Sequence, residues 1–553
     1  MTFPWLVLGV LGTATLAGAF AMTTRRYFVA AVAGSAAILL MQNGYFHYTS
    51  DDAYITFRYS RNLADGIGPY WNPGEHVEGY TNFLWMALLA ALHKLGADIV
   101  PTARWLGFAL ALGATAGAYR LVCDLCHDSA ARAGGVLAAV LLSASGAWGV
   151  WSFAGLESSL VAALIIAAVL LHVREMPGTP LQLSGIVWAF AAMTRPEALV
   201  LAAVSAGFKV AATVTHRGDA RLPRRVASFL SWSVPFGVMY GTYFAWRYAT
   251  YGWLFPNTYY AKVGSGLDQW ERGLRYASTF LQEYGGWSLL IAPIAFATPT
   301  FSAARGGYTL ALLAAWMAVV VYVGGDSLVR LRLFAPVLPV YYAFIVAAAA
   351  SLAARFDLFK APTAFRTIGL GAAAMAAIAM TLYPSAAGFG AGFWFERERQ
   401  AVADRAALGR WLRANVDADA RIAVVPAGAI PYESRLQSID MLGLNDEHIA
   451  HRQIALGAFP AGHEKYDSDY VLDRRPDIIV LNELTTTAPW HRAQYRDAVG
   501  ASLIPAVADM TDNERLWREY ETQAVRRADG RWFNLLVRRD SAAILGDTKR
   551  ITE

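Results

Sequence analysis

The sequence predicts a bundle of transmembrane helices followed by a small polar α/β domain, a mainly α fold class. Two observations favour this. Of the 553 residues, 56% are hydrophobic and only 16% are charged, against roughly 25% charged in an ordinary soluble domain. The charges also concentrate after residue 388, whereas long runs before it carry almost none. This composition excludes a soluble enzyme, a disordered chain and a secreted disulfide scaffold.

Apolar runs before residue 388 provide about 11 to 13 candidate spans, since a bilayer takes about 20 apolar residues per helix. The first run, 4–22, has no basic segment before it, so we expect a retained helix rather than a cleaved signal peptide. The other candidates lie near 27–46, 81–95, 101–122, 133–153, 157–172, 183–213, 227–247, 286–300, 308–324, 333–353 and 367–387. We therefore predict a multi-pass membrane domain over residues 1–388.

Basic residues in short loops predict which ends of the spans face the cytoplasm. The basic clusters lie at Arg25-Arg26, 216–225, Arg305 and 355–366 (Arg355, Lys360 and Arg366). Counting crossings from them places the loops 47–80, 248–285 and 324–327, and the chain after residue 388, on the outer side of the cytoplasmic membrane. The same clusters carry much of the net charge of +5, so we expect no nucleic-acid partner.

Two segments leave the number of crossings open. Segment 81–95 is short, and segment 183–213 contains Thr194-Arg-Pro-Glu197, which fits either a break between two half-helices or the middle of one span. If both are single crossings, Glu157 lies inside. If 81–95 is re-entrant and 183–213 is a broken pair, Glu157 lies outside.

Residues 389–553 predict a small soluble α/β domain. Residues 396–415 have the pattern of an amphipathic helix, and short apolar runs at 421–425, 476–481 and 532–537 have the pattern of strands. Strands that alternate with helical stretches are typical of an α/β fold. Because the chain has no Gly-x-Gly-x-x-Gly and no phosphate loop, we expect no nucleotide site here.

The outer loop 47–80 begins with two adjacent acids, Asp51 and Asp52, directly after a predicted span. Adjacent carboxylates repel each other, so one of them is suited to act as a base, or the two to hold a divalent cation. The alternative is a solvated acidic turn. The loop and its end supply further polar side chains that suit a sugar site, namely Tyr54, Arg58, Glu75, His76, Glu78 and Asn82.

Outer-side cations are the candidates for binding a lipid phosphate. Arg330 and Arg332 begin a span at its outer end, against the positive-inside tendency, and the planar fork of arginine suits phosphate. Lys262 and Arg195 are candidates for the same role. The alternatives are snorkelling of Arg330 and Arg332 to lipid headgroups, and an internal ion pair of Arg195 with Glu197.

Four further residues complete the candidate substrate site, Glu157, Asn257, Tyr259 and Asp326. An asparagine and tyrosines in the segment 255–262 suit hydroxyl and phosphate groups. The alternative for this segment is an aromatic belt at the membrane interface.

Six motifs together resemble the GT-C superfamily of polyprenyl-phosphate-dependent glycosyltransferases, and within it the family of the mycobacterial terminal arabinofuranosyltransferase. They are Asp51-Asp52-Ala-Tyr-Ile, Glu78-Gly-Tyr-Thr-Asn-Phe-Leu-Trp85, Gly155-Leu-Glu157-Ser, Thr194-Arg-Pro-Glu197, Pro256-Asn-Thr-Tyr-Tyr-Ala-Lys262 and Gly324-Gly-Asp326. The run Asp440-Met-Leu-Gly-Leu-Asn445 is similar too. One departure is the C-terminal region, which lacks the pattern of a carbohydrate-binding sandwich.

The resemblance implies an integral membrane enzyme with its active site on the outer face. The catalytic aspartate of the first large outer loop maps onto Asp51 or Asp52, and the donor is a sugar on a polyprenyl phosphate. Some members of the superfamily use a divalent cation such as Mg or Mn, which Asp51 and Asp52 would hold.

We therefore predict a glycosyltransferase of cell-envelope biogenesis that moves a sugar, with arabinofuranose among the candidates, to a hydroxyl of a glycan, lipid or protein acceptor. The alternatives are a lipid-linked glycan ligase or polymerase and a secondary transporter. A transporter predicts internal repeats and acids at the membrane midplane, whereas here the acids cluster in one outer loop.

Overall fold

The computed structural model describes residues 27–128, 131–215, 221–264, 266–356, 391–481, 485–499 and 504–551. The predicted spans 4–22 and 367–387 and the basic residues Arg25, Arg26, Lys360 and Arg366 lie outside this part of the chain. By its contacts the chain divides into two compact units. The first unit comprises Met1–Tyr48, Ala103–Trp246 and Gly273–Phe395, and the second comprises Thr49–Thr102, Arg247–Arg272 and Glu396–Glu553.

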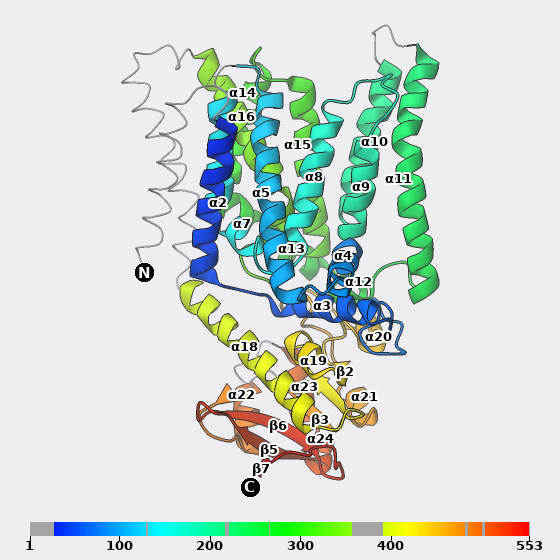
Figure 1. Ribbon diagram of the computed structural model, residues 1–553, viewed down its shortest axis with the longest axis vertical. Helices are drawn as coiled ribbons and strands as arrows, with labels where there is room; N and C mark the ends of the chain where they lie inside the picture. Colours follow the sequence, from blue (N-terminus) through cyan, green and yellow to red (C-terminus); the bar gives the residue numbers. More distant parts are fainter. Residues whose placement is uncertain are drawn as a thin grey trace. The chain divides into compact units, whose positions relative to one another are not determined.

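The first unit is a bundle of helices, many of them long and roughly parallel or antiparallel (Figure 1). Its helices, three of which extend past its boundaries, are α2 (Tyr27–Phe46), α5 (Ile99–Leu125), α6 (Ala131–Ala144), α7 (Gly146–Trp151), α8 (Ser158–His172), α9 (Ser184–Thr194), α10 (Ala198–Thr215), α11 (Leu222–Tyr251), α13 (Leu267–Glu283), η1 (Gly286–Ile291), α14 (Ala292–Phe296), α15 (Ala303–Val323), η2 (Arg332–Val337) and α16 (Leu338–Arg355). Within the described residues, five helical stretches are long and apolar enough to cross a membrane, namely α2, α5, α10, α15 and Arg332–Arg355.

The predicted span 183–213 is a broken pair, because α9 ends at Thr194 and α10 begins at Ala198. The two helices run antiparallel, since Lys209 near the end of α10 donates to Glu175 ahead of α9 at 2.8 Å. An α9 of 11 residues is about 16 Å long, which is shorter than the roughly 30 Å of a bilayer core.

The predicted span 81–95 is the helix α4 (Phe83–Lys94), which belongs to the second unit. Its 12 residues rise only about 18 Å. A single crossing by this helix alone is therefore excluded, because it is shorter than the roughly 30 Å of a bilayer core. The side of the membrane on which Glu157 lies stays a prediction.

The second unit contains a mixed sheet with strand order β2-β1-β3-β6-β5-β7, in which β4 pairs with β6. Strand β1 is parallel to β2 and β3, and β6 is antiparallel to β3 and β5. The strands are β1 (Arg421–Val424), β2 (Gln437–Asp440), β3 (Ile478–Val480), β4 (Thr485–Thr486), β5 (Tyr520–Arg526), β6 (Trp532–Arg538) and β7 (Lys549–Arg550). The helices are α3 (Asp51–Ala64), α4, α12 (Asn257–Lys262), α18 (Ala391–Asn415, from Glu396), α19 (Ala429–Ser434), α20 (Glu447–His451), α21 (Ser468–Asp473), α22 (Arg492–Val499), α23 (Pro505–Asp512) and α24 (Glu514–Glu519).

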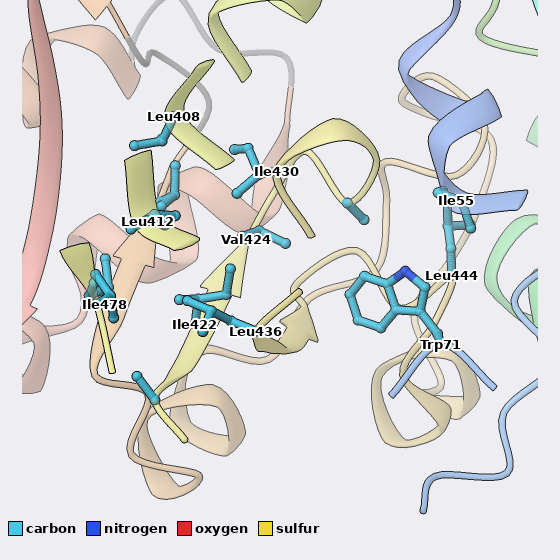
Figure 2. Close-up of a cluster of buried hydrophobic side chains, with 14 of the residues drawn as sticks. Ile55, Trp71, Leu408, Leu412, Ile422, Val424, Ile430, Leu436, Leu444 and Ile478 are labelled. Carbon is cyan, nitrogen blue, oxygen red and sulfur yellow. The ribbon is translucent and has the colours of Figure 1, made fainter. Parts of the chain in front are cut away.

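One apolar core in the second unit joins segments that are far apart in the sequence. Ile55 of α3 and Trp71 are buried in the same cluster as Leu412 of α18 and Val424 of β1 (Figure 2). The segment 47–80 was expected to be an outer loop of the membrane domain. In the structure most of it folds with the C-terminal residues, and Asp51–Ala64 is a helix, because its apolar and aromatic side chains are covered there.

Candidate functional site

The two acids of the outer segment form the first turn of α3. Ser50 is the N-cap, and Asp51 and Asp52 follow it. Negative side chains in the first turn interact favourably with the helix dipole. The local sequence therefore explains why an acidic pair can begin a helix at this point.

The structure distinguishes the two acids. The Asp51 carboxylate accepts hydrogen bonds from the backbone N–H of Gly428 at 3.2 Å and of Ala429 at 3.1 Å, and Arg405 lies 3.7 Å from it. Asp52, by contrast, makes no hydrogen bond or ion pair with any residue that the structure describes. Asp51 is therefore an anchored carboxylate, and Asp52 is the one available to a substrate.

A third carboxyl group, Glu398 of α18, belongs to this acidic region and was missed by the sequence analysis. It lies two helical turns before Arg405, on the same face of the helix. Burial raises its pKa, and the negative charges of Asp51 and Asp52 raise it further, against the pull of Arg405. The heptad spacing of Glu398 and Arg405 in an amphipathic helix was the available signal.

The described residues contain no group of three or more potential metal ligands. A divalent cation at Asp51 and Asp52 would therefore need ligands from the substrate as well. The metal requirement stays a prediction.

Arg58, a predicted sugar ligand, is only 2% exposed and faces the protein. Its guanidinium donates to the carbonyls of Trp71 at 2.6 Å and Leu436 at 2.8 Å and to the Asn72 side chain at 3.0 Å. A further hydrogen bond reaches the carbonyl of Pro431. Burial lowers the Arg58 pKa to about 9, because neutral oxygens replace water without a carboxylate in contact.

Glu78 is buried and ion-paired with Arg247, whose Nε lies 2.7 Å from its carboxylate. Burial raises the Glu78 pKa to about 7, and the nearby Arg247 charge opposes this rise. The backbone carbonyl of Glu78 also accepts from the N–H of Asn257 at 3.0 Å. The two motifs that carry Glu78 and Asn257 therefore meet in the structure.

Asn257 is buried against the run that the sequence analysis noted at 440–445. Its amide donates to the carbonyls of Gly443 at 2.9 Å and Leu444 at 3.1 Å. Asn445 of the same run lies 3.3 Å from the hydroxyl of Tyr59 on α3. These motif residues thus hold the segments of the second unit together.

The other predicted ligands of the second unit occupy varied environments. The Tyr54 ring packs 5.4 Å from that of Tyr432, and the Tyr259 ring packs 4.5 Å from that of Phe255. The remaining four differ as well. Glu75 pairs with Arg474 at 2.7 Å, and the Nδ1 of the exposed His76 lies 3.1 Å from the Thr250 carbonyl. The buried Asn82 donates to Thr56 at 3.0 Å, and for the half-buried Lys262 the described part of the chain provides no hydrogen bond or ion pair.

In the first unit, Arg195 lies between two carboxylates. It donates to Glu157 at 2.9 Å and forms a second ion pair with Glu197. Arg195 follows α9 and Glu157 precedes α8, so the pair joins two helix ends. The internal ion pair weighed in the sequence analysis is thus present, and a phosphate role for Arg195 stays a prediction.

The segment after α15 carries the other charged candidates. The Arg332 Nε donates to Asp326 at 2.6 Å, and its guanidinium lies 5.9 Å from the ring centroid of Trp151. Arg330 and Leu331 both adopt left-handed backbone, with φ of 55° and 49°. Such strain costs about 1–3 kcal/mol per residue and clusters at functional sites.

The Arg195 cluster and the Arg332–Asp326 pair of the first unit lie at the same end of the bundle as Tyr48. The Trp151 ring contacts that of Tyr48 at 6.3 Å as well as Arg332. The opposite end holds basic residues instead. There, Arg174 pairs with Asp124 at 2.6 Å, and Arg305 donates to the Asp124 carbonyl at 2.8 Å.

Comparisons with known proteins agree with this architecture. A family described as a domain of unknown function, DUF8728, matches residues 393–534. The chain is similar to the terminal β-(1→2)-arabinofuranosyltransferase of Mycobacterium tuberculosis, with 26% identity over 264 residues, which cover 45% of this chain and 40% of that protein. It is also similar to the terminal β-(1→2)-arabinofuranosyltransferase of Corynebacterium glutamicum, with 27% identity over 356 residues, which cover 53% of this chain and 47% of that protein. The matched part thus spans less than half the length of either relative.

A solved structure has the same fold over nearly the whole length. The crystal structure of ArnT from Cupriavidus metallidurans bound to undecaprenyl phosphate superposes with a TM-score of 0.54 and 13% identity, covering 94% of this chain and 99% of that one. At this identity the likeness concerns the fold alone. The predicted resemblance to terminal arabinofuranosyltransferases and the predicted helical membrane bundle with a small C-terminal sheet domain are confirmed, and the chain is a multi-pass membrane protein.

Proposed function

We propose that this GT-C-type chain is a glycosyltransferase that moves a sugar, arabinofuranose being the first candidate, from a polyprenyl phosphate to a hydroxyl of a cell-envelope acceptor. The similarity to the terminal arabinofuranosyltransferases supports the reaction class. One structural observation carries the mechanism. In the described structure Asp52 makes no hydrogen bond or ion pair, directly beside an Asp51 that backbone amides hold in place.

In the proposed reaction Asp52 accepts the proton of the acceptor hydroxyl. The acceptor oxygen forms a bond to the anomeric carbon of the donor sugar, and the bond between that carbon and the phosphate oxygen breaks. The electron pair leaves with the polyprenyl phosphate, and the proton stays on Asp52. A positioned base of this kind contributes about 10²–10⁴-fold to the rate.

The negative charge that develops on the leaving phosphate needs cationic partners. We assign this role to Arg330 and Arg332, because arginine offers a planar, permanently charged fork. Lys262 is a further candidate. Arg195 has two carboxylates beside it, so we assign it the weaker role of orienting Glu157.

The proposal also includes the sidedness. Arg305, which was predicted to lie inside, is at the end of the first unit opposite Tyr48, and Arg174 lies there too, since both contact Asp124. This supports the proposal that the Tyr48 end of the first unit faces the outer side of the cytoplasmic membrane. A membrane-impermeant thiol reagent should label a His76→Cys variant in intact cells and leave an Arg174→Cys variant unlabelled. The opposite labelling pattern would reverse the assignment.

The decisive test compares the two acids in the purified full chain. With a polyprenyl-phosphate arabinofuranose donor, Asp52→Asn should lower kcat at least about 100-fold while the protein unfolds at the wild-type temperature. Asp51→Asn should instead lower the unfolding temperature, because it weakens the hydrogen bonds to Gly428 and Ala429.

Near-normal turnover by Asp52→Asn would refute the assigned base. Mass spectrometry of the products then distinguishes a single added sugar from a transferred or polymerised glycan, which is the predicted alternative of a ligase or polymerase.

A further inference from the structure

We infer that the domain of residues 393–534, which matches only a family of unknown function, positions the acid-bearing helix α3, with Arg58 as its main positioning residue. The inference rests on the proposed function for the role of Asp52. The attachment itself stands on contacts within the second unit. Three polar contacts hold α3 to this domain.

The first contact is the guanidinium of Arg58. It reaches from the second turn of α3 to two backbone carbonyls of the C-terminal domain, those of Pro431 and Leu436. Pro431 lies within α19 and Leu436 immediately precedes β2, and the two residues are 373 and 378 positions from Arg58 along the chain. An arginine has five N–H groups in a fixed fork, so one side chain fixes both the position and the rotation of α3.

The second contact is the side chain of Asn72, which pairs with the backbone of β2. Its Nδ2 donates to the Ser438 carbonyl at 2.7 Å, and its Oδ1 accepts from the Ser438 N–H at 3.0 Å. Strand β2 is at the edge of the sheet, and an amide side chain offers the same donor and acceptor as a peptide group. Asn72 therefore fastens the segment that follows α3, and Arg58 donates to the same Oδ1 at 3.0 Å.

The third contact is at the first residue of α3. A Cβ atom at Gly428 would lie 2.1 Å from the backbone oxygen and 2.7 Å from the carboxylate carbon of Asp51. The close approach lets the Gly428 and Ala429 amides reach the Asp51 carboxylate. The C-terminal domain thus holds the residue immediately before the proposed base.

Behind these polar contacts the packing is apolar. Ile55 and Trp71 share one buried cluster with Ile422, Leu436 and Leu444 of the C-terminal domain (Figure 2). Side chains in a close-packed interior transmit small shifts. A displacement of about 1 Å in a reacting group can lower the rate about 10²-fold. Rigid positioning of α3 by this domain therefore bears directly on the reaction rate.

Hydrogen exchange and kinetics on the purified full chain test this inference. The variants are Arg58→Lys and the milder Asn72→Ala. The matched control is Arg492→Lys, because the guanidinium of Arg492 lies 4.9 Å from the Trp517 ring centroid, as that of Arg58 lies 4.9 Å from Trp71. Arg492 pairs with Glu514 in another part of the same domain.

In Arg58→Lys we expect the amides of residues 51–64 to exchange about tenfold faster or more. We also expect kcat to fall about 10–100-fold, with the donor KM changed less than about threefold. Asn72→Ala should shift both quantities in the same direction by less. Arg492→Lys should leave the exchange of residues 51–64 and kcat at their wild-type values.

Unchanged protection of residues 51–64 in Arg58→Lys would overturn the inference, and so would faster exchange with an unchanged kcat. Failure of the proposed function is a separate result. If the wild-type chain transfers no sugar, the exchange measurement still tests whether this domain holds α3.

Discussion

Two buried arginines, one in each unit, are satisfied in opposite ways. Arg58 of the second unit is surrounded by neutral oxygens, mostly backbone carbonyls. Arg195 of the first unit lies between the carboxylates of Glu157 and Glu197. Neutral acceptors hold the Arg58 guanidinium in place without neutralising its positive charge. The two carboxylates beside Arg195 instead give that cluster a net negative charge. The partners of a buried charge therefore indicate whether it fastens the chain or shapes the local field.

The largest expected effect comes from the same substitution at both arginines. Arg58→Met and Arg195→Met should each lower the free energy of unfolding by about 3–5 kcal/mol, because buried acceptors or charges lose their partner. The two variants should differ in their response to a second substitution. Glu157→Gln should partly restore Arg195→Met, since it removes one of the two unpaired carboxylate charges, whereas no side-chain substitution removes the backbone carbonyls around Arg58.

Unfolding curves in detergent of Arg58→Met, Arg195→Met and the double variant Arg195→Met/Glu157→Gln make this comparison. A double variant that is less stable than Arg195→Met alone would contradict the distinction between neutral and charged partners.

The next effect concerns Glu78, a buried acid of the second unit with an arginine partner. Its pKa is raised from 4.5 to about 7, so the folded state binds a proton more tightly than the unfolded state. The free energy of unfolding should therefore fall by roughly 3 kcal/mol as the pH rises from about 4.5 to 7, and level off above it. Glu78→Gln should remove this slope. A slope that persists unchanged in the variant would assign it to other groups, such as Asp440, whose pKa burial raises to about 6.

A smaller effect is expected from Gly428→Ala. The new methyl group would meet the Asp51 backbone, which cannot swing away as a flexible side chain would. We expect a loss of about 1–3 kcal/mol in the free energy of unfolding. Gly530→Ala cannot serve as the control, because the positive φ of 83° at Gly530 would itself strain an alanine. Gly266→Ala is better, because a Cβ there meets its nearest atom only at 3.8 Å. Equal losses at both positions would show that the approach to Asp51 is not tight.

The smallest effect is expected at the surface. Arg475 and Asp540 pair with side chains that are each 61% exposed. Solvent screens exposed pairs, so Asp540→Asn should leave the unfolding temperature at its wild-type value. A loss as large as that of Arg58→Met would show that charge alone, rather than burial, decides these effects.

The sequence alone predicted those helices and strands whose apolar or amphipathic pattern is uninterrupted. The apolar runs at 421–425, 476–481 and 532–537 are confirmed as β1, β3 and β6, and the amphipathic run 396–415 lies within α18. Strands β2 and β5 were missed, because polar residues such as Gln437 and Glu521 interrupt their apolar pattern. The break between α9 and α10 was visible as an open alternative, because Pro196 and two charges interrupt the apolar run.

The candidate site was only partly accessible to such reasoning. The acids Asp51 and Asp52 stand out in the sequence, but their unequal roles depend on backbone amides 377 positions away. Arg58 and Asn257 were expected to bind substrate, and in the structure their side chains donate to backbone carbonyls. A sequence shows that a polar residue lies in an apolar context. It does not show which distant oxygen satisfies that residue.

The contact between Arg58 and Pro431 also sets an order of events during synthesis. The two residues are 373 positions apart, and a ribosome adds about 5–20 residues per second, so about 20 to 75 seconds separate their appearance. During this interval Asp51 and Asp52 are already synthesised, but the C-terminal residues that hold α3 are not. A chain that stops before residue 431 would therefore carry both acids without the backbone contacts that hold α3.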